Sequence, residues 1–388
     1  MDFLQQSFSV NFEYKVHFTE QLFSISNTIF NDFLKEGHLA GVKRKLLFII
    51  DQGVAEHHPS LSQQVDAYFN NNEFVELVTE KLLVAGGENV KNEEIFFKQI
   101  VEAINRHGID RHSYVAAIGG GAVLDLVGYA AAVSHRGIKH IRIPTTVLAQ
   151  NDSGVGVKNG INYLGKKNFL GTFVPPAVVF NDFKFLITLN DRHWRSGISE
   201  AIKVALIRDA LFFCWLEENA LVLALRDMKA MQYLIRRCAA LHLLHISGGD
   251  PFETGSSRPL DFGHWSAHKL EQMTNFSVLH GEAVAVGIAL DSMYSKLSGL
   301  LSEENSKRII QVLLKVGLPV THPMASAEEA NSPILMGLQE FREHLGGRLT
   351  IMLLKDIGKG EEVHEMDPAL IRESARLLQN WKVVENLF

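Results

Sequence analysis

Short apolar runs alternate with amphipathic segments through the first half of the chain, and this alternation constrains the fold most. Two runs, KRKLLFIID (43–51) and SYVAAIGG (113–120), end in turn residues, as buried parallel strands do. Between them, segment 91–108 carries apolar residues at helical spacing, with Gly108 where a helix C-cap would fall. A third run, GIKHIRIPTT (137–146), is stopped by Pro144. This βαβ order predicts an α/β domain with a mostly parallel sheet.

The pattern changes at about residue 183, where long helical segments begin to dominate. They lie at 193–220, 228–246, 263–273 and 280–299. We therefore expect a Rossmann-like α/β N-terminal domain over 1–182 and a mostly α-helical C-terminal domain over 183–388. At the start of the chain, SFSVNFEYKVHF (7–18) alternates apolar and polar residues, which predicts an antiparallel or edge strand.

Composition excludes several classes of protein. The 388 residues carry a formal net charge of -6 and no Lys/Arg-rich run, which argues against a nucleic-acid partner. The opening residues lack the features of a signal peptide, and no apolar stretch is long enough for a membrane span. Two cysteines, Cys214 and Cys238, are too few for a disulfide scaffold, and we expect two buried thiols in a cytoplasmic protein.

A glycine-rich turn, Gly119-Gly120-Gly121, follows one predicted strand and opens the segment AVLDLVGYAAAV. This arrangement lets a backbone approach a pyrophosphate at a helix N-terminus, although a tight turn without a ligand gives the same pattern. Asp125 is placed to hydrogen-bond a ribose or to cap the helix. The other candidates at carboxyl ends of strands are Asp51, Glu88 and Lys91.

Carboxylate and imidazole side chains recur on the predicted helices of the second half. Glu200 and Lys203 are three residues apart and share a helix face, and His264 and His268 are four apart on another. His280 begins a further helical segment. One carboxylate and two imidazoles form a typical catalytic zinc set that leaves coordination positions open. Any single one of the 17 histidines is more often a surface or core residue.

The stretch between the two halves, QNDSGVGVKNGINYLGKKNFLG (150–171), is dense in polar residues and glycine. Its composition is that of a solvated loop. It is also that of a substrate-binding loop, because lysines and asparagines supply donors for phosphate and sugar hydroxyls. Arg136, just upstream, adds a guanidinium.

Six blocks, read in order, resemble dehydroquinate synthase and its relatives, the sugar phosphate cyclases. The resemblance runs from about residue 51 to 359 and rests on the following segments: GGGAVLDLVGYAAAVSHRG, IPTTVLAQNDSGVGVKNGIN, GKKNFLGTFVPP, SGISEAIKVALIRDALFFCWLEEN, LDFGHWSAH and LHGEAVAVG. It implies an NAD-binding N-terminal domain and a helical domain that binds a divalent metal, Zn²⁺ or Co²⁺, and substrate.

The resemblance also implies residue roles. The metal ligands match Glu200, His264 and His280. The substrate-loop residues match Asp152, Lys158, Lys167 and Asn168. The NAD-binding positions match the glycine run with Glu88, Lys91, Asp125, Thr145 and Thr146. Lys203 matches a catalytic lysine, His268 a histidine on the phosphate side, and Arg136 an arginine that reaches into the neighbouring subunit of a dimer. The family has glycine where this chain has Leu124.

The departures from the family concern the substrate. In dehydroquinate synthase a lysine and an arginine hold the substrate carboxylate. His242 stands at the lysine position and Ser257 at the arginine position, with Arg258 one residue out of register. Asp261 replaces an asparagine, and His344 replaces a late lysine. These changes suit an uncharged polyol better than an acid. They resemble the 2-epi-5-epi-valiolone synthases, which act on sedoheptulose 7-phosphate, and the dehydroquinate-synthase-like proteins of ebo gene clusters.

The implied reaction uses NAD for transient oxidation, followed by phosphate elimination, reduction and intramolecular aldol closure. Three alternatives remain. Dehydroquinate synthase activity would be supported by Arg258 acting in the carboxylate clamp. A metal-dependent alcohol or glycerol dehydrogenase would accumulate NADH. A non-enzymatic relative would bind NAD and metal without releasing phosphate from any sugar phosphate.

Overall fold

The computed structural model describes residues 3–36, 44–248, 252, 260–327, 332–344 and 349–381. These residues form two compact units. One comprises Met1–Pro144 with Val157–Asp182, and the other comprises Thr145–Gly156 with Phe183–Phe388. Segment 145–156, which the expected division places in the N-terminal domain, packs within the helical unit. Its Asn151 side chain donates a hydrogen bond to the Gly197 carbonyl oxygen at 2.8 Å.

The first unit is built on a six-stranded parallel sheet in the order β1-β8-β5-β4-β2-β3. The strands are β1 (Lys15–Thr19), β2 (Arg44–Asp51), β3 (Val75–Val84), β4 (Tyr114–Gly119), β5 (Lys139–Pro144) and β8 (Val178–Asp182). The helices are α1 (Ile29–Lys35), α2 (Gln52–His57), α3 (Leu61–Phe69), α4 (Glu94–Arg106) and α5 (Gly121–Val133). The predicted α/β class with a mostly parallel sheet is confirmed.

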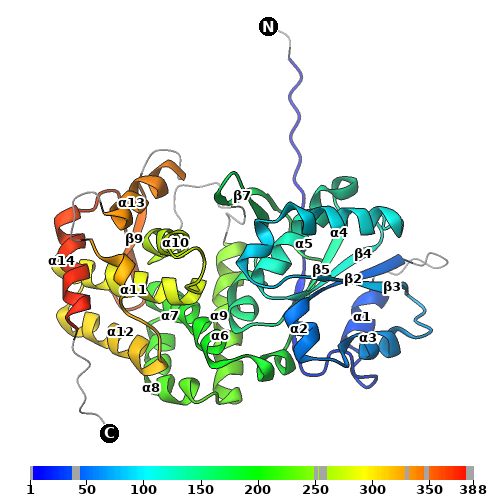
Figure 1. The fold of residues 1–388 in the computed structure, drawn as a ribbon, viewed down its shortest axis with the longest axis horizontal. Helices are drawn as coiled ribbons and strands as arrows, with labels where there is room; N and C mark the ends of the chain where they lie inside the picture. The colour runs from blue at the N-terminus through cyan, green and yellow to red at the C-terminus, as the bar shows by residue number, and fades with distance from the viewer. Residues whose placement is uncertain are drawn as a thin grey trace. The chain divides into compact units, whose positions relative to one another are not determined.

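The central strands are apolar along their whole length because helices cover both faces of the sheet. Residues 46–50 of β2 have no exposed surface, and β4 is buried throughout. Helices α1 and α3 lie on one face and α4 and α5 on the other (Figure 1). Strand β1 lies at an edge, as expected, but it pairs with β8 in parallel, so the antiparallel alternative is wrong.

Helix α4 ends where the sequence predicted. Its last residue is Arg106, and Gly108 follows the C-cap in the left-handed region at φ +59°. The Ile109 amide then donates to the Ile104 carbonyl at 2.9 Å, which closes the helix end.

The polar stretch that composition assigned to a loop is instead largely a β-hairpin. Strands β6 (Lys158–Tyr163) and β7 (Lys166–Phe173) pair antiparallel, and Leu164 and Gly165 form a two-residue turn with φ of +51° and +73°. The hairpin is tied to the sheet by the buried Arg142, whose guanidinium donates to the Lys158 carbonyl and to Asn159 Oδ1, both at 2.7 Å.

The second unit is mostly α-helical, as predicted. Its helices are α6 (Asp191–Ser196), α7 (Ile198–Arg208), α8 (Ala210–Ala224), α9 (Met228–Ser247), α10 (His264–Met273), α11 (His280–Leu297), α12 (Glu303–Val316), α13 (Pro333–His344) and α14 (Pro368–Gln379). A hairpin of β9 (Ile351–Asp356) and β10 (Lys359–Val363) completes it. The segment 193–220 is divided among three helices, with breaks at Gly197 and Asp209.

Glycines allow the helices of the second unit to approach closely. A Cβ on Gly287 of α11 would lie 2.0 Å from the carbonyl oxygen of Gly263, the residue before α10. A Cβ on Gly281 would lie 1.9 Å from the carbonyl oxygen of Ser196, at the end of α6. Each contact is backbone against backbone, so a larger residue cannot be accommodated by a side-chain movement.

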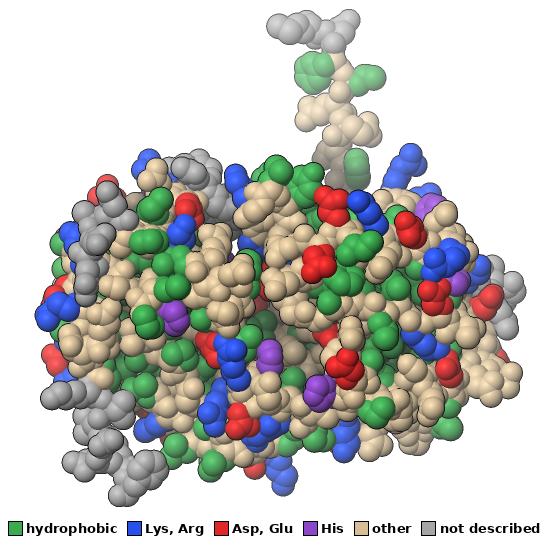
Figure 2. Space-filling model, viewed as in Figure 1, with side chains coloured by type: hydrophobic (Ala, Val, Ile, Leu, Met, Phe, Trp, Pro, Cys, Tyr) green, Lys and Arg blue, Asp and Glu red, His purple; other side chains and the backbone are tan. Residues whose placement is uncertain are grey.

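Surface features agree with part of the sequence analysis. Charged side chains of both signs are interspersed over the face drawn in Figure 2. Among the described helices, none combines the length and apolar character needed to cross a bilayer. Cys238 is buried, but Cys214 is exposed on α8, so the expectation of two buried thiols is wrong for Cys214.

We predict that Gly287→Ala destabilises the protein. Replacing a helical glycine by alanine ordinarily stabilises by about 1 kcal/mol. Here the methyl group would meet the Gly263 carbonyl oxygen, and such overpacking costs about 1–3 kcal/mol. Urea unfolding should show a lower midpoint for the variant. An unchanged or raised midpoint would mean that α10 and α11 do not pack this closely.

Candidate functional site

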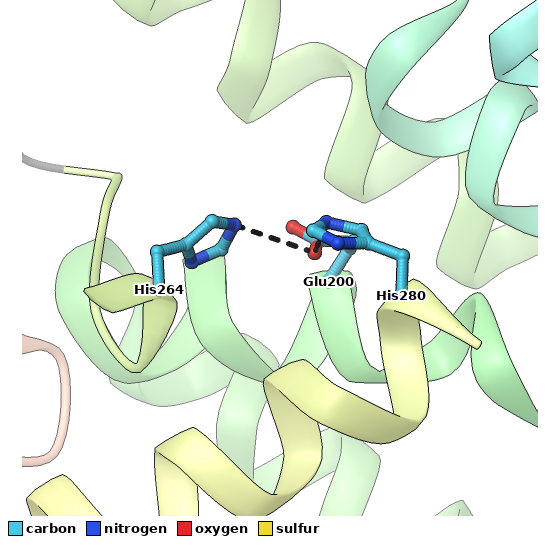
Figure 3. A group of neighbouring side chains, drawn as sticks. All are labelled: Glu200, His264 and His280. Atoms are coloured by element: carbon cyan, nitrogen blue, oxygen red, sulfur yellow. Dashed lines mark ion pairs between the residues drawn. The ribbon is translucent and has the colours of Figure 1, made fainter. Parts of the chain in front are cut away.

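Three side chains from three helices of the second unit converge on one point. Glu200 comes from α7, His264 from the first turn of α10 and His280 from the first turn of α11 (Figure 3). Glu200 Oε1 lies 3.5 Å from His280 Nε2 and 3.8 Å from His264 Nε2. A tetrahedral ion with Zn-type bond lengths holds its ligand atoms about 3.4 Å apart, so the spacing fits one cation.

The burial of Glu200 also fits a bound cation. The residue has no exposed surface, and among the described residues neither carboxylate oxygen has a well-formed hydrogen bond. A buried ionised carboxylate without hydrogen bonds is strongly unfavourable unless a positive charge compensates it. Lys203 Nζ provides one such charge, 2.5 Å from Oε2. Oε1 faces the two imidazoles and is available to a second positive charge, that of a bound cation.

Electrostatics keep two of the three groups, Glu200 and His264, in the protonation states that a metal requires. Burial alone would raise the pKa of Glu200, but Lys203 and the two imidazoles hold it well below its ordinary value. Burial, reinforced by Lys203, holds the pKa of His264 well below its ordinary value. Burial lowers the pKa of Lys203, and the carboxylates of Glu200, Asp152 and Asp261 outweigh that and raise it. At neutral pH the site therefore offers an anionic carboxylate and a neutral imidazole.

Asp152 lies beside this group and is paired with His242, which stands where the family has a lysine. Asp152 Oδ1 is 2.8 Å from His242 Nδ1 of α9. Burial raises the pKa of Asp152, and the attraction of His242 outweighs it, so the pKa lies below its ordinary value. The pair places an imidazole where the family resemblance expects a lysine.

A second carboxylate, Asp291 of α11, accepts hydrogen bonds from the residues on either side of His264. Its Oδ2 accepts from the Gly263 amide at 3.0 Å, and its Oδ1 accepts from Trp265 Nε1 at 2.9 Å. These two bonds hold the residues on either side of His264 and therefore set the direction of its imidazole. Burial raises the pKa of Asp291 to about 7, although both hydrogen bonds act to lower it.

His268 follows His264 by one helical turn, and the centroids of their rings are 5.5 Å apart. His268 Nδ1 lies 3.2 Å from Glu271 Oε2, and the same oxygen lies 3.1 Å from His280 Nδ1. The backbone carbonyl of Asp261, just before α10, accepts a hydrogen bond from the His264 amide at 3.0 Å.

In the first unit, the expected cofactor residues form a polar cluster around Lys91. The buried Lys91 Nζ donates to Asp125 Oδ2 at 2.9 Å and to Asn168 Oδ1, and lies 3.5 Å from Glu88 Oε1. Asp125 lies inside α5 and bonds Lys91, so the alternative that it caps the helix is wrong. The N-cap of α5 is Gly120.

Asp51 has a local structural role. Its carboxylate accepts from the Gly53 amide at 2.8 Å and caps α2. Cβ atoms on Gly86 and Gly119 would lie 2.7 and 3.2 Å from its side chain, so the glycine turns pack around it. Burial raises the pKa of Asp51, against hydrogen bonds from Gly53, Val54 and Gly120.

Several other expected site residues are distributed over the two units. Thr145 and Thr146 belong to the helical unit, where Thr146 Oγ1 accepts from the Ala149 amide at 3.1 Å. Lys158 and Lys167 lie on the β6–β7 hairpin of the first unit, which also carries Asn168 of the Lys91 cluster. Arg136, at φ +64°, lines a surface hollow with Arg111, Val133 and His135. Ser257, Arg258 and the side chain of His344 lie outside the described residues.

Two groups at the site were missed by sequence reasoning. No local sequence pattern predicts the role of Asp291, because a single aspartate within an apolar helix is typical of a buried structural residue. Glu271 does offer one, since His264, His268 and Glu271 have i, i+4, i+7 spacing on one face of the predicted helix.

Comparison with known proteins shows which family the chain is similar to. Residues 81–196 match the family model of the 3-dehydroquinate synthase N-terminal domain, and residues 197–336 match that of its C-terminal domain. The 3-dehydroquinate synthase of Nitrosospira multiformis is 38% identical over 296 residues, covering 76% of this chain and 79% of that protein. That of Pseudoalteromonas atlantica is 36% identical over 301 residues, covering 76% and 81%.

Among solved structures, the chain is similar to ValA, the 2-epi-5-epi-valiolone synthase of Streptomyces hygroscopicus subsp. jinggangensis 5008, solved with NAD⁺ and Zn²⁺ bound. The TM-score is 0.86 at 29% identity, over 97% of this chain and 99% of ValA. Fold and site thus define a member of the sugar phosphate cyclases. More narrowly, the chain belongs to the 3-dehydroquinate synthase family.

The raised pKa of Asp291 gives a pH-dependent prediction. The folded carboxyl binds its proton more tightly than the unfolded one, so its stabilising contribution is complete below an ordinary pKa of 3.8 and is lost as pH rises through about 7. Asp291→Asn removes this titration. The unfolding free energy of the variant minus that of wild type should rise by up to about 4 kcal/mol over this window. Urea unfolding across the pH range tests this, and a pH-independent difference contradicts it.

Proposed function

We propose that the protein is an NAD- and metal-dependent sugar phosphate cyclase acting on an uncharged ketose phosphate. The best candidate is sedoheptulose 7-phosphate, which would be converted to 2-epi-5-epi-valiolone with release of phosphate. The observation that carries the proposal is the Asp152–His242 pair, with 2.8 Å between Oδ1 and Nδ1. The likeness of the fold to ValA, at a TM-score of 0.86, supports it.

Glu200, His264 and His280 are the proposed metal ligands. The buried, incompletely hydrogen-bonded carboxylate and the neutral His264 imidazole are the donor set that Zn²⁺ or Co²⁺ prefers. Asp51, Glu88, Lys91, Gly119, Gly120, Gly121, Asp125, Thr145 and Thr146 are the proposed NAD-binding residues. When bound, the cation supplies Lewis acidity toward a substrate hydroxyl, and NAD supplies a reversible hydride acceptor.

The residues of the chain then bind and orient the substrate. Lys203 stays cationic because Glu200, Asp152 and Asp261 raise its pKa, so its ammonium is placed to stabilise an oxyanion. Asp261 and Asp152 offer carboxylate oxygens that accept hydrogen bonds from substrate hydroxyls. These three residues supply one permanent donor and two acceptors, which suits a polyol.

The phosphate group would be bound by basic and amide side chains. The family resemblance implies this role for His268, Lys158, Lys167 and Asn168. Arg136 lies on a strained turn, with His135 at φ +50° and Arg136 at φ +64°. We propose that it completes the site of a second subunit in a homodimer, as the family resemblance implies. Arg258 and His344 are further proposed substrate contacts outside the described side chains.

The alternative function is 3-dehydroquinate synthase acting on an acidic heptulosonate phosphate. Its support is that the relatives at 36–38% identity carry this name. Against it stands His242, which replaces the lysine of the family's carboxylate clamp. The Asp152–His242 pair presents the Asp152 carboxylate next to the position where a substrate carboxylate would lie. A metal-dependent alcohol dehydrogenase is disfavoured by membership of the synthase family.

We predict that Glu200→Ala or His280→Ala abolishes both metal retention and turnover. Each variant removes one of three ligand atoms that lie within 4.8 Å of one another. Zn²⁺ content after dialysis and phosphate release measure the two effects. The control is His193→Ala, an exposed histidine on α6 away from the cluster, which should retain its metal. Full activity in a metal-free Glu200→Ala protein would rule out the site.

We predict phosphate release from sedoheptulose 7-phosphate without accumulation of NADH at 340 nm. His242→Lys should shift the preference toward the acidic heptulosonate phosphate by about 10-fold in relative kcat/KM, because it restores a cation at the clamp. Wild-type turnover of the acidic substrate alone would establish the alternative function. Net NADH formation from a simple alcohol would establish a dehydrogenase.

A further inference from the structure

One buried carboxylate of the helical unit connects two of the histidines at the site. Glu271 lies on α10 with its side chain 2% exposed. Its Oε2 lies 3.2 Å from His268 Nδ1 and 3.1 Å from His280 Nδ1. The two rings lie nearly parallel, at 20° between planes and 5.9 Å between centroids. A single oxygen therefore faces the same atom of both imidazoles.

These contacts select one tautomer of each ring. A carboxylate oxygen accepts hydrogen bonds, so a bonded Nδ1 carries the hydrogen. In a neutral imidazole the lone pair then resides on Nε2. His280 Nε2 is the atom that lies 3.5 Å from Glu200 Oε1, within the proposed metal site. The lone pair of His280 is thus on the nitrogen that faces the other two ligands.

We propose that Glu271 is a positioning residue that fixes the tautomer and direction of His280 and, through the same oxygen, of His268. A carboxylate hydrogen-bonded to the far nitrogen of a metal-binding histidine also raises the basicity of the ligating nitrogen. The proposal rests on His280 acting as a metal ligand, as in the proposed function, but it does not depend on which sugar phosphate is the substrate.

A competing arrangement is available to the same residues. His268 Nδ1, Glu271 and His280 Nδ1 are close enough to surround a cation themselves. The separations of 3.1 and 3.2 Å are also within the range of N–H···O hydrogen bonds, which need no ion. His280 can direct Nε2 to the Glu200 site and Nδ1 to Glu271 at once, so the hydrogen-bonded arrangement satisfies both of its nitrogens.

The test is a Co²⁺ titration of the full-length, NAD⁺-loaded protein, followed by visible absorption. Glu271→Gln keeps the shape of the side chain and one acceptor oxygen, but it loses the negative charge that raises the basicity of the ligating His280 nitrogen. We expect a Co²⁺ dissociation constant about 10–100-fold higher than wild type, with an altered spectrum. The thermal midpoint of the metal-free protein should change little, because a merely structural role would instead lower it.

Glu282→Gln is the matched control. Glu282 is also a carboxylate at the start of α11, where it accepts from the Leu279 amide and pairs with Arg192, without a described contact to His280. Its loss should lower the thermal midpoint and leave the Co²⁺ dissociation constant unchanged. The two variants therefore separate positioning of the ligand from stability of the helix.

Three outcomes would overturn the inference. A Glu271→Gln protein that binds Co²⁺ as tightly as wild type would show that the carboxylate does not act through His280. Loss of Co²⁺ in Glu271→Gln with retention in Glu200→Ala would place the ion between His268, Glu271 and His280. Retention in both variants would show that neither Glu200 nor Glu271 is needed to hold the ion, and would so overturn the metal site of the proposed function as well. Failure of every sugar phosphate to react, with the Co²⁺ results as expected, would leave the inference intact.

Discussion

The helical unit depends on the compensation of one buried carboxylate. Glu200 has no exposed surface, and burying an ionised carboxylate costs several kcal/mol unless opposite charge and hydrogen bonds offset it. Lys203 faces one oxygen, and two imidazoles approach the other. The arrangement requires three helices to meet within a few ångströms. The glycines at their contacts, which allow backbone to touch backbone, are part of the same constraint.

Local signals predicted much of the fold. The apolar runs at 43–51 and 113–120 form buried strands. A strand that is apolar on both sides is stable only where helices cover both faces of the sheet, so these runs predicted central strands. The β6–β7 hairpin was missed for an equally physical reason. Its strands are rich in lysine, asparagine and glycine, and its turn is Leu164-Gly165 rather than Asn-Gly. It is held by Arg142 of β5, a contact that no pattern within the hairpin itself reveals.

The candidate site was likewise predicted only in part. The resemblance of short blocks around Glu200, His264 and His280 implied the proposed metal ligands, and the structure brings these three side chains together. Spacing alone did not single out the trio. The pairing of Asp152 with His242 joins residues that are far apart in sequence, so no local pattern contains it. The Asp291 hydrogen bonds depend on the packing of α11 against the start of α10, which is a tertiary feature.

The three converging side chains come from α7, α10 and α11, with long intervals of chain between the first and the other two. An unfolded chain has no chelating arrangement of these groups, so a cation bound by all three has affinity for the folded unit alone. Its concentration then shifts the folding equilibrium by mass action. Metal supply would thereby govern how long this half of the molecule survives proteolysis, independently of any catalytic turnover.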